Sequence, residues 1–258
     1  MTPPRFFGKN SVGYETDRTM TERKQGRRSA QAAEETKLLI IKTAAEMFCE
    51  LGYERVSLRN ISERAGVSHS LIRHHFGSKE KIWHSISDCL HAYFLSYMYK
   101  LLEEIPAELP SNVILYRFST MLLAQQLVHP EPIQLIADGM RQGDVLIDYF
   151  FDSNGELERF VTELVDSCNE GFPTTPVKVW EIKWQMLMFA HGAASMKPFL
   201  IETWRGENAS HEQCLLNHWE LFNRNMASLL NVEADQMLHP SDLKEILIEL
   251  PCEWGCGV

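Results

Sequence analysis

A cluster of hydrogen-bond donors lies on a short helical pattern that follows a tight turn at Gly66. Ile72 and Phe76 are four residues apart, so on a helix both point to one side and leave the donors on the other. Hydroxyl, imidazole and guanidinium groups on an exposed helix face are what reading the major groove of DNA requires. The residues on this face are His69, Ser70, Arg73 and His74.

Two short helical patterns and a third, longer one position these donors. Gly66 stands where the first pattern, Leu58 to Ala65, must end and the chain must turn. Ser57 is placed to cap that helix, Ser68 the donor-bearing helix, and Ser78 the next one. Residues 58–82 are therefore expected to form a helix-turn-helix that leads directly into a third helix.

Long apolar patterns flank the helix-turn-helix. Residues 36–51 show apolar side chains every three or four positions, and Gly52 ends the run. Residues 79–105 carry one apolar stripe with no Pro or Gly, which predicts a single helix spanning both the DNA-binding module and the body. Such a helix could transmit a displacement between them.

The net charge of −10 is distributed unevenly. Residues 1–33 have a net charge of +4, residues 34–81 of +1 and residues 82–258 of −15. A basic front on an acidic body suits a protein that holds one face toward phosphate. Residues 1–33 show no hydrophobic period, so we expect a disordered arm. Its basic run, Arg23 to Arg28, either enters the minor groove or is a solvated tail.

The rest of the chain consists of helical patterns without a useful alternating strand pattern, which predicts an all-α protein. Further helices are expected at 113–128, 131–142, 144–170 with an interruption at 152–155, 177–203 and 208–231. The expected domains are the arm at 1–33, the helix-turn-helix domain at 34–82, a helical regulatory and dimerisation domain at 83–231, and a tail at 232–258 with a short amphipathic turn at 243–250.

Residues 36–83 resemble the TetR family of bacterial transcriptional regulators. The first helix matches at Ala44, Ala45, Gly52 and Tyr53, and the motif then continues through Ser57, Ile61, Ala65, Gly66, Val67, Ser68, Ile72, His75, Phe76, Ser78, Lys79 and Glu80. The body shares only the general plan of five or six further helices. Arg73 departs from the family's usual tyrosine and could bind a phosphate or, bidentately, a guanine.

The resemblance and the helical positions together suggest which residues contact DNA. Base contacts are expected from His69, Ser70 and Arg73, a methyl contact from Leu71, and a further contact from Arg59; the capping Ser68 belongs to the same surface. Phosphate contacts are expected from Ser57, His74, His75 and Lys79, although His75 could instead be a core-edge histidine. Three histidines on one helix also suggest that DNA binding strengthens as the pH falls from about 8 to 6.

The resemblance implies a homodimer and a small-molecule pocket in the body. A heptad stripe on the last long helix is a candidate dimer interface, with an intramolecular helix pair as the alternative: Leu215, Trp219, Phe222, Met226 and Leu229. Soft and aromatic residues are candidates for the pocket, although such stripes also form plain core: Tyr93, Tyr97, Phe118, Leu122, Tyr149, Trp184 and Met188. Arg141 and His191 could orient an acidic ligand.

The sequence favours a cytoplasmic protein that is not an enzyme. It contains no recognised catalytic motif, and the pair Cys252 and Cys256 with His239 has poor zinc spacing, so we expect no metal and no cofactor. The expected function is a ligand-released repressor bound to a palindromic operator, with double-stranded DNA, an unidentified effector and a second copy of the chain as partners. The alternatives are a DNA-binding protein controlled by a protein partner and, more remotely, a helical enzyme.

Overall fold

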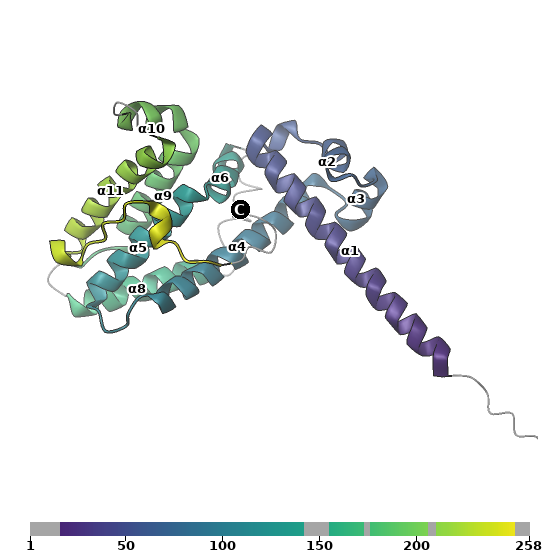
Figure 1. The fold of residues 1–258 in the computed structure, drawn as a ribbon, viewed down its shortest axis with the longest axis horizontal. Coiled ribbons are helices and arrows are strands. Elements are labelled where there is room, and N and C mark those ends of the chain that lie inside the picture. The colour runs from purple at the N-terminus through teal and green to yellow at the C-terminus, as the bar shows by residue number, and fades with distance from the viewer. Residues whose placement is uncertain (1–15, 142–154, 173–175, 206–209, 251–258) are drawn as a thin grey trace, which may run out of the picture. The chain divides into compact units, whose positions relative to one another are not determined.

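The structure is a computed structural model that describes residues 16–141, 155–172, 176–205 and 210–250, without the side chains of 16–29 and 141. The described residues form helices and no strands, as the sequence predicts (Figure 1). Residues 1–39 and residues 40–258 form two separate compact units. The expected helix at 144–170 falls partly outside the described ranges, and Tyr149 lies outside them entirely.

The first helix, α1, is longer than the sequence suggests. It extends over Thr16–Leu51, whereas its helical pattern was expected to begin at Thr36 and residues 1–33 to be disordered. The disorder prediction is wrong for residues 16–33, because the absence of a hydrophobic period excludes a buried face and not a helix. This stretch has no proline, a single glycine and many strong helix formers.

The helix-turn-helix domain consists of the end of α1, a short 3-10 turn η1 (Tyr53–Arg55), α2 (Leu58–Ala65) and α3 (His69–His75). These elements share one apolar cluster with the start of α4 (Lys79–Glu104). The most deeply buried side chains of the cluster include Ile40, Phe48, Ile61, Ile72 and Trp83. Burial of aliphatic and aromatic side chains on this scale supplies most of the domain's stability.

Helix α4 contributes to two cores, as the unbroken apolar stripe predicts. Ile82 and Ile86 are buried with the helix-turn-helix, and Tyr97 and Leu101 are buried with the body. The helix has neither proline nor glycine within it, so the two clusters are joined by a continuous rod of 26 residues.

The body is built around α5 (Ser111–Val128), which is buried on most sides. Helices α8 (Glu156–Gly171), α9 (Val179–Ser195) and α11 (His211–Leu229) pack against it. Helix α6 (Glu131–Arg141) packs on α9, and α10 (Lys197–Trp204) packs on α9 and α11. The single helix expected over 177–203 is two helices, because the chain breaks at Met196 and restarts with Pro198 in the first turn of α10.

The heptad stripe of α11 lies in the chain's own core. Trp219, Phe222 and Met226 are fully buried, and Trp219 Nε1 donates a hydrogen bond to the Thr120 carbonyl of α5 at 2.8 Å. Leu215 is also buried, and Leu229 is half-buried against the same cluster. The prediction that this stripe is the dimer interface is therefore wrong, since these side chains pack on α5 within one chain.

The segment after α11 is packed and is not a loose tail over its described part. The backbone N–H of Leu238 donates to Tyr116 Oη at 2.8 Å, and Asn223 Nδ2 donates to the Leu238 carbonyl at 3.0 Å. A 3-10 turn, η3 (Leu243–Ile246), then buries Leu243 against α5. Residues 232–250 thus belong to the body.

Candidate nucleic-acid interface

Helix α3 is fixed on the domain by two apolar side chains and a cap. Ile72 is fully buried and Phe76 is 5% exposed, as their spacing predicts. Ser68 Oγ accepts a hydrogen bond from the Leu71 backbone N–H at 3.2 Å, which satisfies one of the free donors at the start of the helix. The orientation of α3 is therefore set by contacts that leave its outer face unused.

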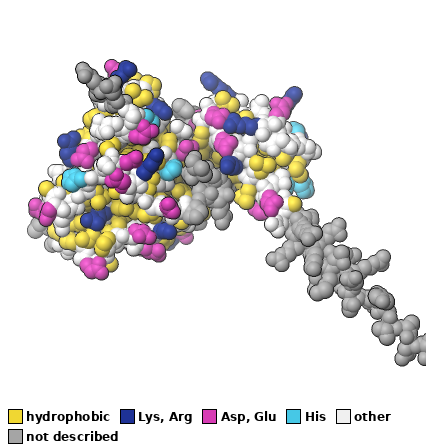
Figure 2. All heavy atoms as spheres, viewed as in Figure 1, with side chains coloured by type: hydrophobic (Ala, Val, Ile, Leu, Met, Phe, Trp, Pro, Cys, Tyr) yellow, Lys and Arg dark blue, Asp and Glu magenta, His cyan; other side chains and the backbone are white. Residues whose placement is uncertain are grey.

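The outer face of α3 is exposed and rich in donors. Ser68, His69, Ser70, Arg73 and His74 are exposed, whereas Leu71 and His75 are half-buried. The ring centroids of His74 and His75 are 5.6 Å apart. Figure 2 shows histidine side chains at the edge of the domain near α3. The structure thus brings together, on one accessible helix, the residues expected to contact bases.

The turn that presents α3 depends on a left-handed residue. Gly66 has φ 68° and ψ 24°, and its N–H donates to the Ser62 carbonyl to close α2. A Cβ at this position would meet nothing within 4 Å, so space does not require glycine here. The backbone conformation does, because residues with a Cβ enter the left-handed region only at a cost.

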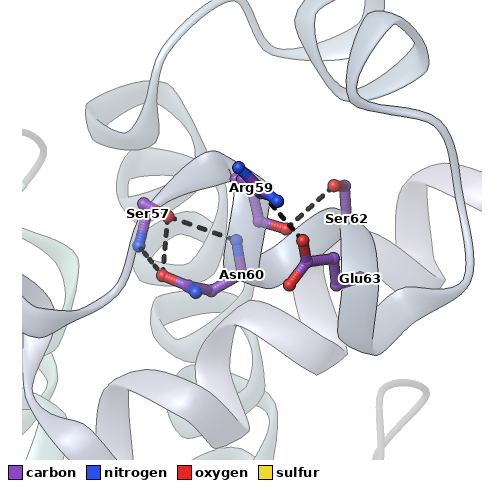
Figure 3. A network of polar contacts seen from close by, with 5 residues as sticks. All are labelled: Ser57, Arg59, Asn60, Ser62 and Glu63. Carbon is purple, nitrogen blue, oxygen red and sulfur yellow. Dashed lines mark hydrogen bonds and ion pairs between the residues drawn. The ribbon is translucent and has the colours of Figure 1, made fainter.

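Ser57 serves as a cap for α2 (Figure 3). Its Oγ accepts from the Asn60 N–H at 3.2 Å, and Asn60 Oδ1 accepts from the Ser57 N–H at 3.0 Å. The Ser57 hydroxyl lies 2.6 Å from the same Oδ1, so its only proton is used within the capping box. The expected phosphate contact from this hydroxyl is not available in this arrangement.

Arg59 is exposed on the first turn of α2 and pairs with an acid one helical turn later. Its Nε lies 2.8 Å from Glu63 Oε1, a contact that also appears in Figure 3. The hydrogen bond to Glu63 raises the pKa of the guanidinium above its usual value. The terminal nitrogens of Arg59 are not part of this contact, so the residue can still reach DNA.

Lys79 is engaged within the domain. Its Nζ donates to the Tyr53 carbonyl at 2.9 Å and lies 4.0 Å from the centroid of the Tyr53 ring. Partial burial lowers the pKa of this ammonium. The side chain predicted to contact phosphate therefore also ties the first turn of α4 to the link after α1.

Helix α6 of the body is seated on the helix-turn-helix domain, a relationship that the sequence does not reveal. The Tyr53 backbone N–H donates to the carboxylate of Asp138, which is only 6% exposed. Leu135, one turn earlier on α6, is buried in the apolar cluster of the helix-turn-helix domain. An acidic residue three positions after a buried leucine on an amphipathic helix is the one sequence signal for this contact.

Two further contacts join α6 to the helix-turn-helix domain. The α-carbon of Gly139 lies so close to Trp83 that a Cβ there would approach the indole ring to 3.0 Å. Cys49 Sγ donates to the Glu131 carbonyl at 3.6 Å. Burial and the nearby carboxyl groups, first among them Glu131, raise the pKa of the Cys49 thiol to about 12. The thiol is therefore protonated and unreactive while α6 stays in place.

The residues predicted to line a ligand pocket do not form a single site. Tyr97, Phe118 and Leu122 are buried in one apolar cluster, with Tyr93 packed against it and its hydroxyl accepting from Gln125 Nε2. By contrast, Trp184 is 60% exposed and Met188 is 43% exposed, so both face outward and their assignment to the pocket is wrong. His191 is half-buried, and burial lowers its pKa. The Arg141 side chain and Tyr149 lie outside the described residues.

The described residues contain no group of three or more His, Cys, Asp or Glu side chains that could hold a metal ion. Over the same residues, no helix is long and apolar enough to cross a bilayer.

Comparison with protein families gives a match over residues 40–86 to the model described as bacterial regulatory proteins, tetR family. Among curated relatives, the HTH-type transcriptional repressor Rv3405c of Mycobacterium tuberculosis is 30% identical over 99 residues, which cover 38% of this chain and 47% of that protein. The HTH-type transcriptional regulator TtgR of Pseudomonas putida is 37% identical over 65 residues, or 25% of this chain and 31% of that protein. The chain thus spans about half the length, or less, of the curated relatives it matches.

Solved structures resemble the fold over most of the chain. The fatty acid degradation regulator FadR from Bacillus halodurans aligns with a TM-score of 0.51 and 15% identity over 76% of this chain and 98% of that one. PfmR from Thermus thermophilus, a TetR family transcriptional regulator, gives a TM-score of 0.47 with 21% identity, covering 75% and 98%. At these identities the FadR likeness carries the fold alone.

Proposed function

We propose that the chain is a homodimeric repressor of the tetR family of bacterial regulatory proteins, whose model matches residues 40–86. It binds a palindromic operator through α3 and releases it on binding a small molecule. The observation that carries the proposal is the donor-rich outer face of α3, positioned by buried Ile72 and Phe76 and left without packing partners of its own.

The dimensions and chemistry of α3 suit the major groove. A helix of seven residues is about 10 Å long, and a major groove about 12 Å wide admits it end-on or lengthwise. His69, Ser70 and Arg73 then face base edges, and Leu71 faces a thymine methyl. His74 and His75 lie toward the phosphates on either side, and Arg59 on α2 adds a further base contact.

The surface of α9 and α10 provides a dimer interface in place of the buried stripe of α11. Trp180, Trp184 and Met188 follow one another at helical spacing and are 61%, 60% and 43% exposed. Phe199 on α10 is 73% exposed and Met196 between the helices is 54% exposed. Large apolar side chains exposed to this extent mark an interaction surface, and a two-fold axis through it would set two α3 helices on one operator.

Helix α6 connects the body to the DNA-binding domain through direct contacts. A ligand that displaced α6 would disturb Leu135 and Asp138, and with them the link at Tyr53 and the start of α4. Two α3 helices that change their separation lose register with successive major grooves, so the operator is released.

Selection of bound DNA from a random pool tests the proposal. We expect enriched sequences with two inverted half-sites whose centres are separated by about 10 base pairs or a multiple of that. Enrichment of a single half-site would contradict the dimer. Absence of any enrichment at low salt would contradict operator binding itself. A specific operator that no small molecule releases would favour control by a protein partner.

A further inference from the structure

A cleft of about 440 Å³ opens at the elbow between α5 and α6. Its walls come from the end of α5, the first turns of α11 and the turn η3. The volume is within the range of small-molecule sites, about 300–1,000 Å³. None of the residues predicted from the sequence to line a pocket belongs to it, so it is a separate candidate for the effector site.

One wall of the cleft is apolar. Leu127, Leu215 and Leu243 are each less than 10% exposed and come from α5, α11 and η3 respectively. Val128 and Pro130 extend this wall to the elbow itself. Contact with these side chains would remove a hydrocarbon part of a ligand from water.

The other wall offers donors. His211 Nδ1 is shielded from solvent and has no hydrogen-bond partner in the described structure. Lys244 also lines the cleft. Its ammonium has no salt bridge or hydrogen bond among the described residues, but its charge helps to lower the pKa of the Glu212 carboxylate. A shielded nitrogen without a partner is costly. A ligand oxygen relieves that cost once the imidazole turns and exposes the nitrogen to the cleft.

The two carboxylates that line the cleft are already used by the fold. Asp242 Oδ1 accepts the Lys244 backbone N–H at 2.9 Å and caps η3. The Glu212 carboxylate accepts from its own backbone N–H and from the Ser210 hydroxyl, which lowers its pKa. Hydrogen bonding leaves a carboxylate its negative charge but uses its acceptor capacity within the fold, so His211 and Lys244 supply the donors that remain for a ligand oxygen.

The elbow connects this cleft to the DNA-binding domain. Pro130 immediately precedes α6, and its carbonyl accepts the Gln134 N–H at 2.9 Å in the first turn of that helix. Farther along the same helix, Leu135 and Asp138 are held by the DNA-binding domain. A molecule that pressed on Val128 and Pro130 would therefore bear directly on α6.

We propose that the elbow cleft binds a small organic acid, with its carboxylate at His211 and Lys244 and its apolar part on Leu127, Leu215 and Leu243, and that occupancy shifts α6. The first half of this inference concerns the cleft alone, and the second half rests on the operator binding proposed above.

Isothermal titration of the whole chain with two matched pairs of probes tests the cleft. The pairs are octanoate with octan-1-ol, and 3-phenylpropanoate with 3-phenylpropan-1-ol. We expect at least one acid to bind about tenfold more tightly than its alcohol, as for a charge-assisted hydrogen bond. Lys244→Met and His211→Phe are each expected to weaken that acid about tenfold. The matched control Lys42→Met changes an exposed lysine on α1 and should leave affinity unchanged.

The proposed binding site is contradicted if neither acid binds. It is also contradicted if Lys244→Met and His211→Phe leave acid binding intact. Circular dichroism of both variants shows whether the fold is retained. Release of the selected operator by the bound acid tests the second half separately. If the acid binds but the operator is not released, the proposed coupling through α6 is contradicted and the proposed binding site is retained. If the chain binds no operator, the proposed function is contradicted. The titration still shows whether the cleft binds an organic acid.

Discussion

The backbone N–H of Tyr53 donates a hydrogen bond to the buried carboxylate of Asp138, and so joins the end of α1 to α6 across 85 residues of sequence. Gly52, the preceding residue, has φ 82°, and a Cβ there would lie 3.3 Å from Asp138 Oδ1. The carboxylate is therefore fitted closely to the backbone of this link. It is a polar contact between the body and the DNA-binding domain, like that of Cys49 Sγ with the Glu131 carbonyl.

Replacement of Asp138 should destabilise the protein. Asp138→Ala leaves the Tyr53 N–H without its partner, and an unsatisfied buried donor costs about 1–3 kcal/mol in the free energy of unfolding. Urea denaturation followed by circular dichroism measures this loss. Asp138→Asn keeps a carbonyl acceptor and should lose less. Equal stability of Asp138→Ala and the unchanged chain would show that the bond contributes nothing.

Cys49 should report the position of α6. With its pKa raised to about 12, the thiol has almost no thiolate at pH 8 and should react with iodoacetamide far more slowly than in the unfolded chain. Peptide mapping by mass spectrometry gives the rate at this site without removal of the other cysteines. Asp138→Ala, which loosens α6, should accelerate the reaction at Cys49. The buried Cys168 in α8 is the internal control and should not respond.

Local signals account for the parts of the fold that the sequence predicts. The caps at Ser57, Ser68 and Ser78 and the left-handed Gly66 act within a few residues, so helices α2, α3 and α4 begin and end where expected. The exposed side of α3 follows from the same local periodicity. The resemblance to the tetR family suggests what the exposed side of α3 binds, whereas the geometry of that side follows from the sequence pattern alone.

Contacts between distant segments account for what the sequence does not predict. The apolar stripe of α11 looks the same whether it meets α5 or a second chain, and only the fold shows Trp219 bonded to the Thr120 carbonyl. Likewise, the spacing of Trp184 and Met188 specifies a helix face without saying whether that face is covered. The Asp138 contact depends on bringing α6 to a turn 85 residues away. The local pattern of α6 shows an acid three positions after a leucine but does not identify the partner of that acid.

Arg73→Ala should weaken operator binding by about ten- to a hundredfold, in line with 1–3 kcal/mol for a well-placed arginine contact. The side chain is exposed, so circular dichroism should be unchanged. Fluorescence anisotropy on single-base operator variants separates the two possible roles. If Arg73 contacts a guanine, its loss relaxes specificity at one operator position. If Arg73 contacts a phosphate, its loss weakens binding to all sequences equally and reduces the salt slope by about 1. The control is Arg224→Ala, an exposed arginine on α11, and an equal effect there would contradict both roles.

Acid should destabilise the protein partly through His218. Burial lowers the pKa of this imidazole, whose Nε2 lies 3.0 Å from the Phe189 carbonyl. The unfolded chain therefore takes up the proton first, and stability present above about pH 6.5 declines as the pH falls through that value. Chemical denaturation between pH 7.5 and 5 at constant ionic strength measures the slope. His218→Gln should flatten it, and His191→Gln should do the same, because burial also lowers the pKa of His191. An unchanged slope in both variants would exclude this linkage.

Charge on the exposed face of α9 should separate the proposed dimer into monomers. Trp180→Glu together with Trp184→Glu replaces two indoles that are about three-fifths exposed, so the chain itself should remain folded while the interface gains repulsion across the two-fold axis. Sedimentation equilibrium should then report a single chain mass, and operator affinity should fall because only one half-site is held. Tyr99→Glu is the matched control, since Tyr99 on α4 is 55% exposed and lies outside this face. A double variant that stays dimeric would place the interface elsewhere, and a Tyr99→Glu monomer would move it to α4.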